Sequence, residues 1–153
     1  VVITDINQDR LDLAAKVADV TPVNVTKTDL ADIQAQLKIM QGFDVGLEMS
    51  GNQIALDQMV EAMVMGGRIA LLGIRPGKSP VDWIRIVFKA ITLKGIYGRE
   101  IFETWYKMIA MLQNGLDVSG VITHRFAVKD YADGFAAMKS GQSGKVVLNW
   151  RAA

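Results

Sequence analysis

The chain of 153 residues has no cysteine, three prolines and a single histidine. Without cysteine it can form no disulfide and no thiolate metal site, and it has no cysteine nucleophile. No apolar run reaches transmembrane length, so we expect no membrane association. The net charge of +1 leaves no basic footprint for nucleic acid. Because nothing in the chain needs an oxidising compartment, we expect a cytoplasmic protein.

An initiator methionine and the basic start of a signal peptide are also missing. The chain opens Val1-Val2-Ile3-Thr4-Asp5, as though already inside a strand. A composition of 50% hydrophobic and 22% charged residues is nevertheless that of a globular domain with its own core. We therefore expect a folded fragment of a longer protein.

Short apolar runs recur along the first hundred residues, with helical periodicity between them. The helix after residue 52 has apolar positions from Leu56 to Val64, which predict that it ends at Gly66-Gly67. Strands that alternate with helices indicate an α/β fold with a parallel sheet covered on both faces. The five predicted strands are Val1–Thr4, Pro22–Val25, Phe43–Met49, Arg68–Ile74 and Ile91–Tyr97.

The pattern changes near residue 100. From there the sequence predicts a helix through Phe102 and Leu112, a strand Val121–Phe126, a helix through Tyr131 and Met138, and a strand Lys145–Trp150. We therefore divide the chain into residues 1–100, a partial doubly wound sheet, and residues 101–153, an αβαβ-like tail.

Asp5 stands where a doubly wound nucleotide-binding sheet carries the acid that accepts the ribose hydroxyls of adenosine. A carboxylate there suits NAD and repels the 2′-phosphate of NADP. Arg10, five residues on, could lie along the adenine. The alternative is that Asp5 and Asn7 only cap the next helix. Spacing does not decide between them, because the glycine-rich turn that would confirm a nucleotide site is absent.

Small residues follow three of the strands, at Ser50-Gly51, Gly73 and Gly98. Ligands of such sheets bind beyond the carboxyl ends of the strands, where small residues let backbone amides approach them. The alternative is that these are ordinary strand-exit turns.

Several longer motifs resemble the L-threonine 3-dehydrogenases, which belong to the zinc-dependent medium-chain dehydrogenases. The block from Gly95 to Tyr106 is typical of the threonine enzymes, and the block from Gly66 to Gly73 is shared by the whole superfamily. The other motifs are Glu48-Met49-Ser50-Gly51, Ile122-Thr123-His124-Arg125-Phe126 and Ser140-Gly141-Gln142-Ser143-Gly144-Lys145.

The resemblance implies the NAD-binding, C-terminal half of an enzyme that oxidises L-threonine to 2-amino-3-oxobutanoate with zinc as Lewis acid. It implies a Rossmann-type sheet without its first strand, a tail that returns to the catalytic domain, and a homo-oligomer. It implies no zinc ligand and no catalytic residue in this chain, because those come from the N-terminal domain. The implied cofactor residues are Asp5 and Arg10 at the adenosine, Leu72, Gly73 and Ile74 at the nicotinamide, and Ile96 and Tyr97 at its carboxamide.

The absent first strand would leave unpaired edges on the strands that should flank it. We expect these edges to be filled by a longer chain, by closure of the gap or by another copy. The alternative function is a stand-alone module that self-associates and binds nucleotide weakly or not at all.

Three other candidates have simpler interpretations. His124 lacks partner ligands, so we expect a structural role for it. Asp44 and Glu48 form either a carboxylate dyad or, as we prefer, a strand entrance and a crevice residue. Gly77-Lys78-Ser79 lacks the glycine spacing of a phosphate loop, and we expect an ordinary loop there.

Overall fold

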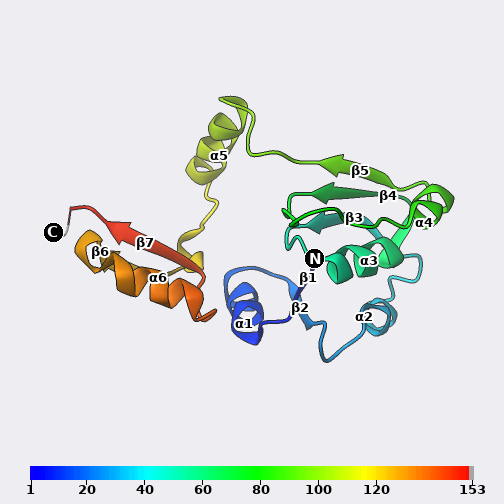
Figure 1. Cartoon of the computed structure of the whole chain (residues 1–153), viewed down its shortest axis with the longest axis horizontal. Coiled ribbons are helices and arrows are strands. Elements are labelled where there is room, and N and C mark those ends of the chain that lie inside the picture. The colour runs from blue at the N-terminus through cyan, green and yellow to red at the C-terminus, as the bar shows by residue number, and fades with distance from the viewer. Residues whose placement is uncertain (152–153) are drawn as a thin grey trace. The chain divides into compact units, whose positions relative to one another are not determined.

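The computed structural model describes residues 1–151 and contains three sets of paired strands (Figure 1). All pairings are parallel, which confirms the predicted α/β class. β1 (Val2–Asp5) pairs with β2 (Thr21–Asn24), β4 (Met63–Leu71) lies between β3 (Phe43–Glu48) and β5 (Thr92–Gly95), and β6 (Ile122–Ala127) pairs with β7 (Lys145–Asn149).

A helix connects the two strands of each parallel pair, as parallel pairing requires. The first four helices begin after Asn7, Asp29, Asn52 and Asp82, whose side chains accept backbone N–H groups of the first turn. The helices are α1 (Gln8–Val17), α2 (Leu30–Gln36), α3 (Gln53–Ala62), α4 (Trp83–Phe88), α5 (Glu103–Gln113) and α6 (Tyr131–Lys139), with 3₁₀ turns η1 (Ser119–Val121) and η2 (Val128–Asp130).

The chain divides into two compact units. One is the continuous middle of the chain, Asp29–Trp105, and the other joins Val1–Thr28 to the segment that starts at Tyr106. The predicted division into residues 1–100 and 101–153 concerns the domains of the intact protein, and it stays a prediction.

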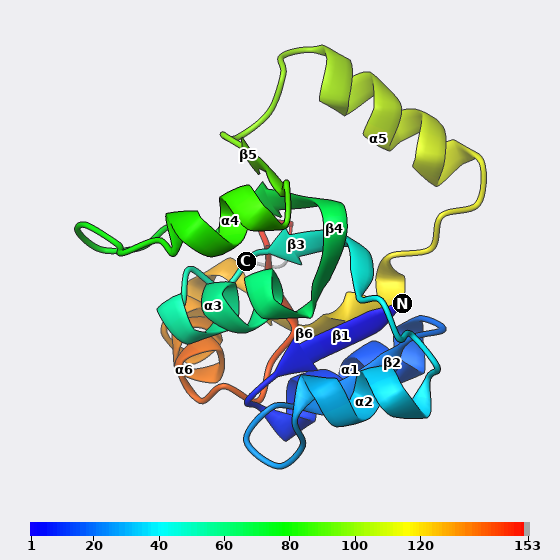
Figure 2. The same ribbon diagram turned by 90° about the vertical axis from the view of Figure 1, so that its right-hand side faces the viewer.

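The core of the middle unit lies on one face of the β3–β4–β5 sheet, where α3 and α4 pack (Figure 2). On the opposite face no helix of this unit packs within the described residues, and Val45 and Leu47 of β3 are 53% and 57% exposed. The expected cover on both faces is therefore not present within this unit. The buried cluster consists of Leu56, Val60, Met63, Ile69, Ile86 and Ile91.

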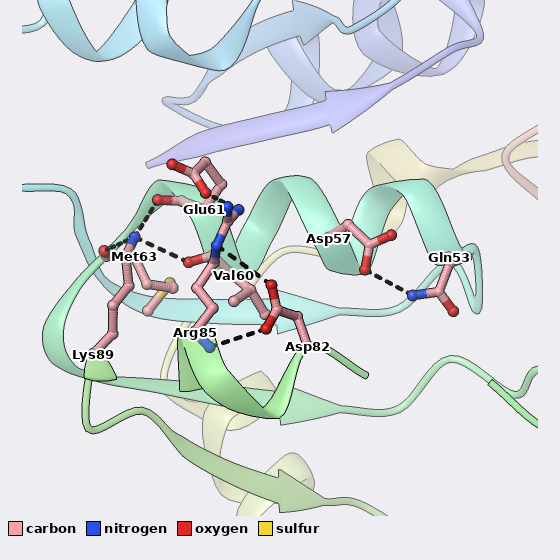
Figure 3. Close-up of polar contacts among 8 residues, drawn as sticks. All are labelled: Gln53, Asp57, Val60, Glu61, Met63, Asp82, Arg85 and Lys89. Carbon is pink, nitrogen blue, oxygen red and sulfur yellow. Dashed lines mark hydrogen bonds and ion pairs between the residues drawn. The ribbon is translucent and has the colours of Figure 1, made fainter. Parts of the chain in front are cut away.

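The predicted end of the third helix is wrong. α3 stops at Ala62 and β4 begins at Met63. Lys89, just after α4, sets this boundary, because its Nζ donates to the carbonyl oxygens of Val60, Glu61 and Met63 (Figure 3). The last carbonyls of a helix lack partners inside it, and here a lysine 26 to 29 residues away supplies them. The apolar periodicity carries no sign of this contact, and it did not predict α4.

The predicted open edges are present. Within residues 1–151, β1 pairs only with β2, and β3 pairs only with β4. β2 is likewise an edge strand and carries Pro22, which cannot donate to a ladder. In the same part of the chain no helix is long and apolar enough to cross a membrane.

Replacing Lys89 with methionine keeps the length of the side chain and removes the three hydrogen bonds. We expect K89M to lower the free energy of unfolding by about 1–3 kcal/mol, because three helix-end carbonyls lose a charged donor. Thermal unfolding measures the loss, and hydrogen exchange should locate it at the end of α3. Lys78, exposed in the loop before α4, provides the control K78M. Equal stabilities for the two variants would contradict the capping role.

Candidate functional site

Three chain segments meet at the carboxyl edge of the β3–β4–β5 sheet. The N–H groups of Leu72 and Gly73 donate to the carbonyl oxygen of Glu48 over 2.8 and 3.0 Å. The N–H of Ile96 donates to the carbonyl oxygen of Leu71 over 2.9 Å. The ends of β3, β4 and β5 are thus joined by backbone hydrogen bonds. Five predicted site residues, Leu72, Gly73, Ile74, Ile96 and Tyr97, therefore lie along one edge.

Glu48 is the buried charged residue of this edge, with 2% of its surface exposed. Its Oε1 accepts the N–H groups of Ser50 and Gly51, both over 2.9 Å, and the Ser50 hydroxyl over 2.5 Å. The carboxylate therefore shapes the turn that follows β3. Asp44 is exposed at the other end of the strand, so the structure supports the crevice interpretation of Glu48 over the dyad.

Backbone from the turns after β3 and β4 is in close contact. A Cβ on Gly73 would lie 2.1 Å from the N of Gly51 and 2.5 Å from the Oε2 of Glu48. A Cβ on Gly51, whose φ is +66°, would lie 2.4 Å from the carbonyl oxygen of Ile74. Only glycine fits at either position. The side chains of Ile74 and Tyr97, in contrast, are almost fully exposed.

Arg75 follows Ile74 in the chain, and its side chain has a hydrogen-bond donor without a partner. Its Nη1 is buried and has no hydrogen-bond partner within the described residues. A buried donor without an acceptor costs free energy, and such groups in native proteins call for a bound water, ion or ligand atom.

Asp5 and Arg10 lie in the other unit, at the start of α1. Asp5 Oδ1 accepts the N–H groups of Ile6 and Asn7 over 2.7 and 2.9 Å, and its Oδ2 lies 4.0 Å from Nη1 of Arg10. The helix cap is Asn7, which accepts the N–H groups of Asp9 and Arg10. Asp5 is therefore not the cap of α1, and one of its carboxylate oxygens remains beside the guanidinium.

The structure shows no sign of a metal centre in the part of the chain it describes, where no three His, Cys, Asp or Glu side chains gather. His124 Nδ1 lies 2.8 Å from the Thr123 hydroxyl, and its ring stacks with Phe126 at 6.1 Å between centroids. These contacts agree with a structural role. Gly77-Lys78-Ser79 lies in the loop before α4, as predicted.

Local motifs did not reveal two polar features of the structure. The unsatisfied donor of Arg75 has no signal in the sequence, and neither has the bond from the Asn7 side-chain amide to the Gly141 carbonyl. The role of the Glu48 side chain in shaping the turn after β3 had one available signal, an acidic residue at the end of a largely apolar strand.

Solved dehydrogenase structures share this architecture. The chain matches 2R,3R-butanediol dehydrogenase from Bacillus subtilis with a TM-score of 0.83 at 21% identity, over 95% of this chain and 42% of that one. It matches a short chain alcohol dehydrogenase from E. coli CFT073, complexed with NADH, with a TM-score of 0.83 at 22% identity, over 97% and 44%. The fold is therefore that of part of an alcohol-dehydrogenase-type enzyme.

The sequence family is more specific than the fold. Residues 1–114 match the family model of zinc-binding dehydrogenases, and the chain belongs to that family. It is 74% identical over 151 residues to the L-threonine 3-dehydrogenase of Ruegeria pomeroyi, covering 98% of this chain and 44% of the relative. It is 58% identical over 153 residues to that of Anaeromyxobacter dehalogenans, covering 100% and 44%. The predicted resemblance is confirmed, and the chain spans under half the length of these relatives.

The close packing at Gly73 gives a direct test of the edge. We expect G73A to lower the free energy of unfolding by about 1–3 kcal/mol, because the new methyl group would overlap backbone that has little room to move. Gly95, at the end of β5, has nothing within 4 Å of its missing Cβ and provides the control G95A. Thermal unfolding of both variants checks the expectation, and G73A as stable as G95A would refute the packing argument.

Proposed function

We propose that this chain is the NAD-binding portion of an enzyme that oxidises L-threonine to 2-amino-3-oxobutanoate. The observation that carries the proposal is the identity of 58–74% to L-threonine 3-dehydrogenases over nearly the whole chain. The described edge of the sheet agrees with it, because the carboxyl ends of three parallel strands meet there, where ligands of such sheets bind.

The residues of the chain fit NAD at two places. Asp5 accepts hydroxyl groups of the adenosine ribose through the oxygen that its own turn leaves unused, and Arg10 lies along the adenine. Leu72, Gly73 and Ile74 lie beside the nicotinamide, and the backbone of Ile96 and Tyr97 holds the carboxamide. NAD, when bound, accepts the hydride that leaves the substrate.

Zinc does not fit the described residues of this chain, and we derive no step through it. In this proposal the zinc ligands and the catalytic residues belong to another part of a longer protein, to which residues 101–153 return. The intact protein is a homo-oligomer, as the family resemblance implies, and cytoplasmic, because nothing in the chain needs an oxidising compartment. The assignment of the zinc ligands and catalytic residues also follows from the family resemblance.

A second candidate is a stand-alone module that self-associates and binds nucleotide weakly or not at all. The observation that favours it is the pair of unpaired edges on β1 and β3, since exposed strand edges promote pairing with other chains.

A chimera tests the proposed function. The 151 matching residues of the Ruegeria pomeroyi enzyme are exchanged for those of this chain, and the native enzyme serves as control. We expect the chimera to bind NADH and to oxidise L-threonine with NAD at a comparable rate. A folded chimera that binds no NADH would exclude this function and favour the stand-alone module.

Asp5 should set the preference for NAD. In the chimera, we expect D5S to raise the KM for NAD about tenfold or more. We also expect it to lower the ratio of the KM for NADP to the KM for NAD, because a carboxylate repels the 2′-phosphate and serine does not. Steady-state kinetics with both cofactors measures this. Asp19, exposed after α1, gives the control D19N, which should match the parent. An unchanged cofactor ratio in D5S would remove Asp5 from the site.

A further inference from the structure

The C-terminal segment, which starts at Tyr106, contacts the start, middle and end of α1. At the start of the helix, Asn7 Nδ2 donates to the carbonyl oxygen of Gly141 over 2.9 Å, a contact that joins residues 134 positions apart. Figure 1 shows the turn between α6 and β7 beside α1. The contact is partly buried, and the residues that make it belong to one compact unit.

Glycines make this close approach possible at three points. A Cβ on Gly141, whose φ is +75°, would lie 3.3 Å from Asn7 Nδ2. A Cβ on Gly144 would lie 2.7 Å from the Leu13 side chain, and one on Gly120 would lie 2.6 Å from that of Val17. The start, middle and end of α1 therefore each face a glycine of the C-terminal segment.

Asn7 uses both ends of its amide. Its Oδ1 accepts the N–H groups of Asp9 and Arg10, and its backbone N–H donates to Asp5 Oδ1. Its Nδ2 is the group that reaches Gly141. A single side chain thus connects the turn of Asp5, the first turn of α1 with Arg10, and the C-terminal segment.

We propose that Asn7 is a positioning residue for cofactor binding, which fixes Asp5 and Arg10 by anchoring their turn to the carbonyl of Gly141. This inference rests on the proposed function, in which those two residues bind adenosine. Asn7 itself need not touch the cofactor. Because a site held in its bound conformation loses less entropy on binding, the bond to Gly141 raises NAD affinity without a contact of its own.

Two substitutions separate the anchor from the helix cap. Aspartate and serine both cap helices well, so N7D and N7S keep the acceptor for the first turn of α1. A carboxylate has no N–H to donate, and a serine hydroxyl is too short to take the place of the amide. Because N7S is neutral, a change seen in both variants cannot come from the negative charge that N7D adds. Asn114 supplies the matched control N114D, because its Nδ2 also donates to a carbonyl, that of Ala110, over 2.7 Å.

The variants are made in the full-length chimera and compared by steady-state kinetics, NADH titration and thermal unfolding. We expect N7D and N7S to raise the KM for NAD and the Kd for NADH about fivefold, because the turn of Asp5 and Arg10 would then have to be ordered when the cofactor binds. We expect kcat, the KM for L-threonine and the melting temperature to stay at the values of N114D. A merely structural role would lower the melting temperature and leave the KM for NAD unchanged.

The outcomes separate this inference from the function on which it rests. If the parent chimera binds NADH and the Asn7 variants bind it equally well, the positioning role is wrong and the proposed function stands. If the parent chimera folds and binds no NADH, the proposed function fails and the inference fails with it. If the KM for NAD rises in both variants while kcat and the KM for L-threonine do not change, the result supports the positioning role of Asn7.

Discussion

The carboxyl edge of the middle sheet depends on the need to satisfy one buried carboxylate. Glu48 is almost completely buried, and a carboxyl group in such a place is tolerated only with hydrogen-bond partners around it. The donors come from Ser50 and Gly51, so the turn after β3 folds back on the end of its own strand. The backbone carbonyl of the same residue receives Leu72 and Gly73. One residue thereby sets the path of two turns, and the close packing of Gly51 on Gly73 and Ile74 follows from it.

The same principle recurs where helices end or begin. Lys89 satisfies the last carbonyls of α3, and Asn7 satisfies the first N–H groups of α1 while it reaches the carbonyl of Gly141. The end of α3 is thus set by a long-range polar contact, and the start of α1 by a local one. The apolar core of the middle unit holds the sheet against α3 and α4, but these polar contacts define the ends of the elements. Ligands of parallel sheets bind at the carboxyl ends of the strands, so the contacts of Glu48 and Asn7 shape both the fold and the candidate site. Lys89 acts at the amino end of β4 and shapes the fold alone.

Most strands and helices could be predicted from the sequence, because alternation of apolar runs with helical periodicity is a local signal. The open edges of β1 and β3 could be predicted too, from the family resemblance. The end of α3 could not, because Lys89 lies far along the chain. The short α4 has six residues, too few to show a clear period. The strand ends that gather Leu72, Ile96 and their neighbours were predictable from parallel topology. Asn7 was recognised as a possible cap, but its bond to Gly141 depends on the tertiary fold alone.

The stretch of chain that matches the family model does not coincide with the compact units of the structure. The family model ends at residue 114, whereas α1 packs against Gly120, Gly141 and Gly144, all beyond that point. Asp5, at the turn into α1, therefore belongs to a unit that is completed by the end of the chain and not by the middle sheet. The middle unit, in contrast, has its own core and its own polar network around Glu48 and Lys89. The two groups of predicted site residues are therefore held by different means. The Leu72–Ile74 segment is held by backbone contacts within one continuous stretch of chain, and the turn of Asp5 by a contact between residues 134 positions apart.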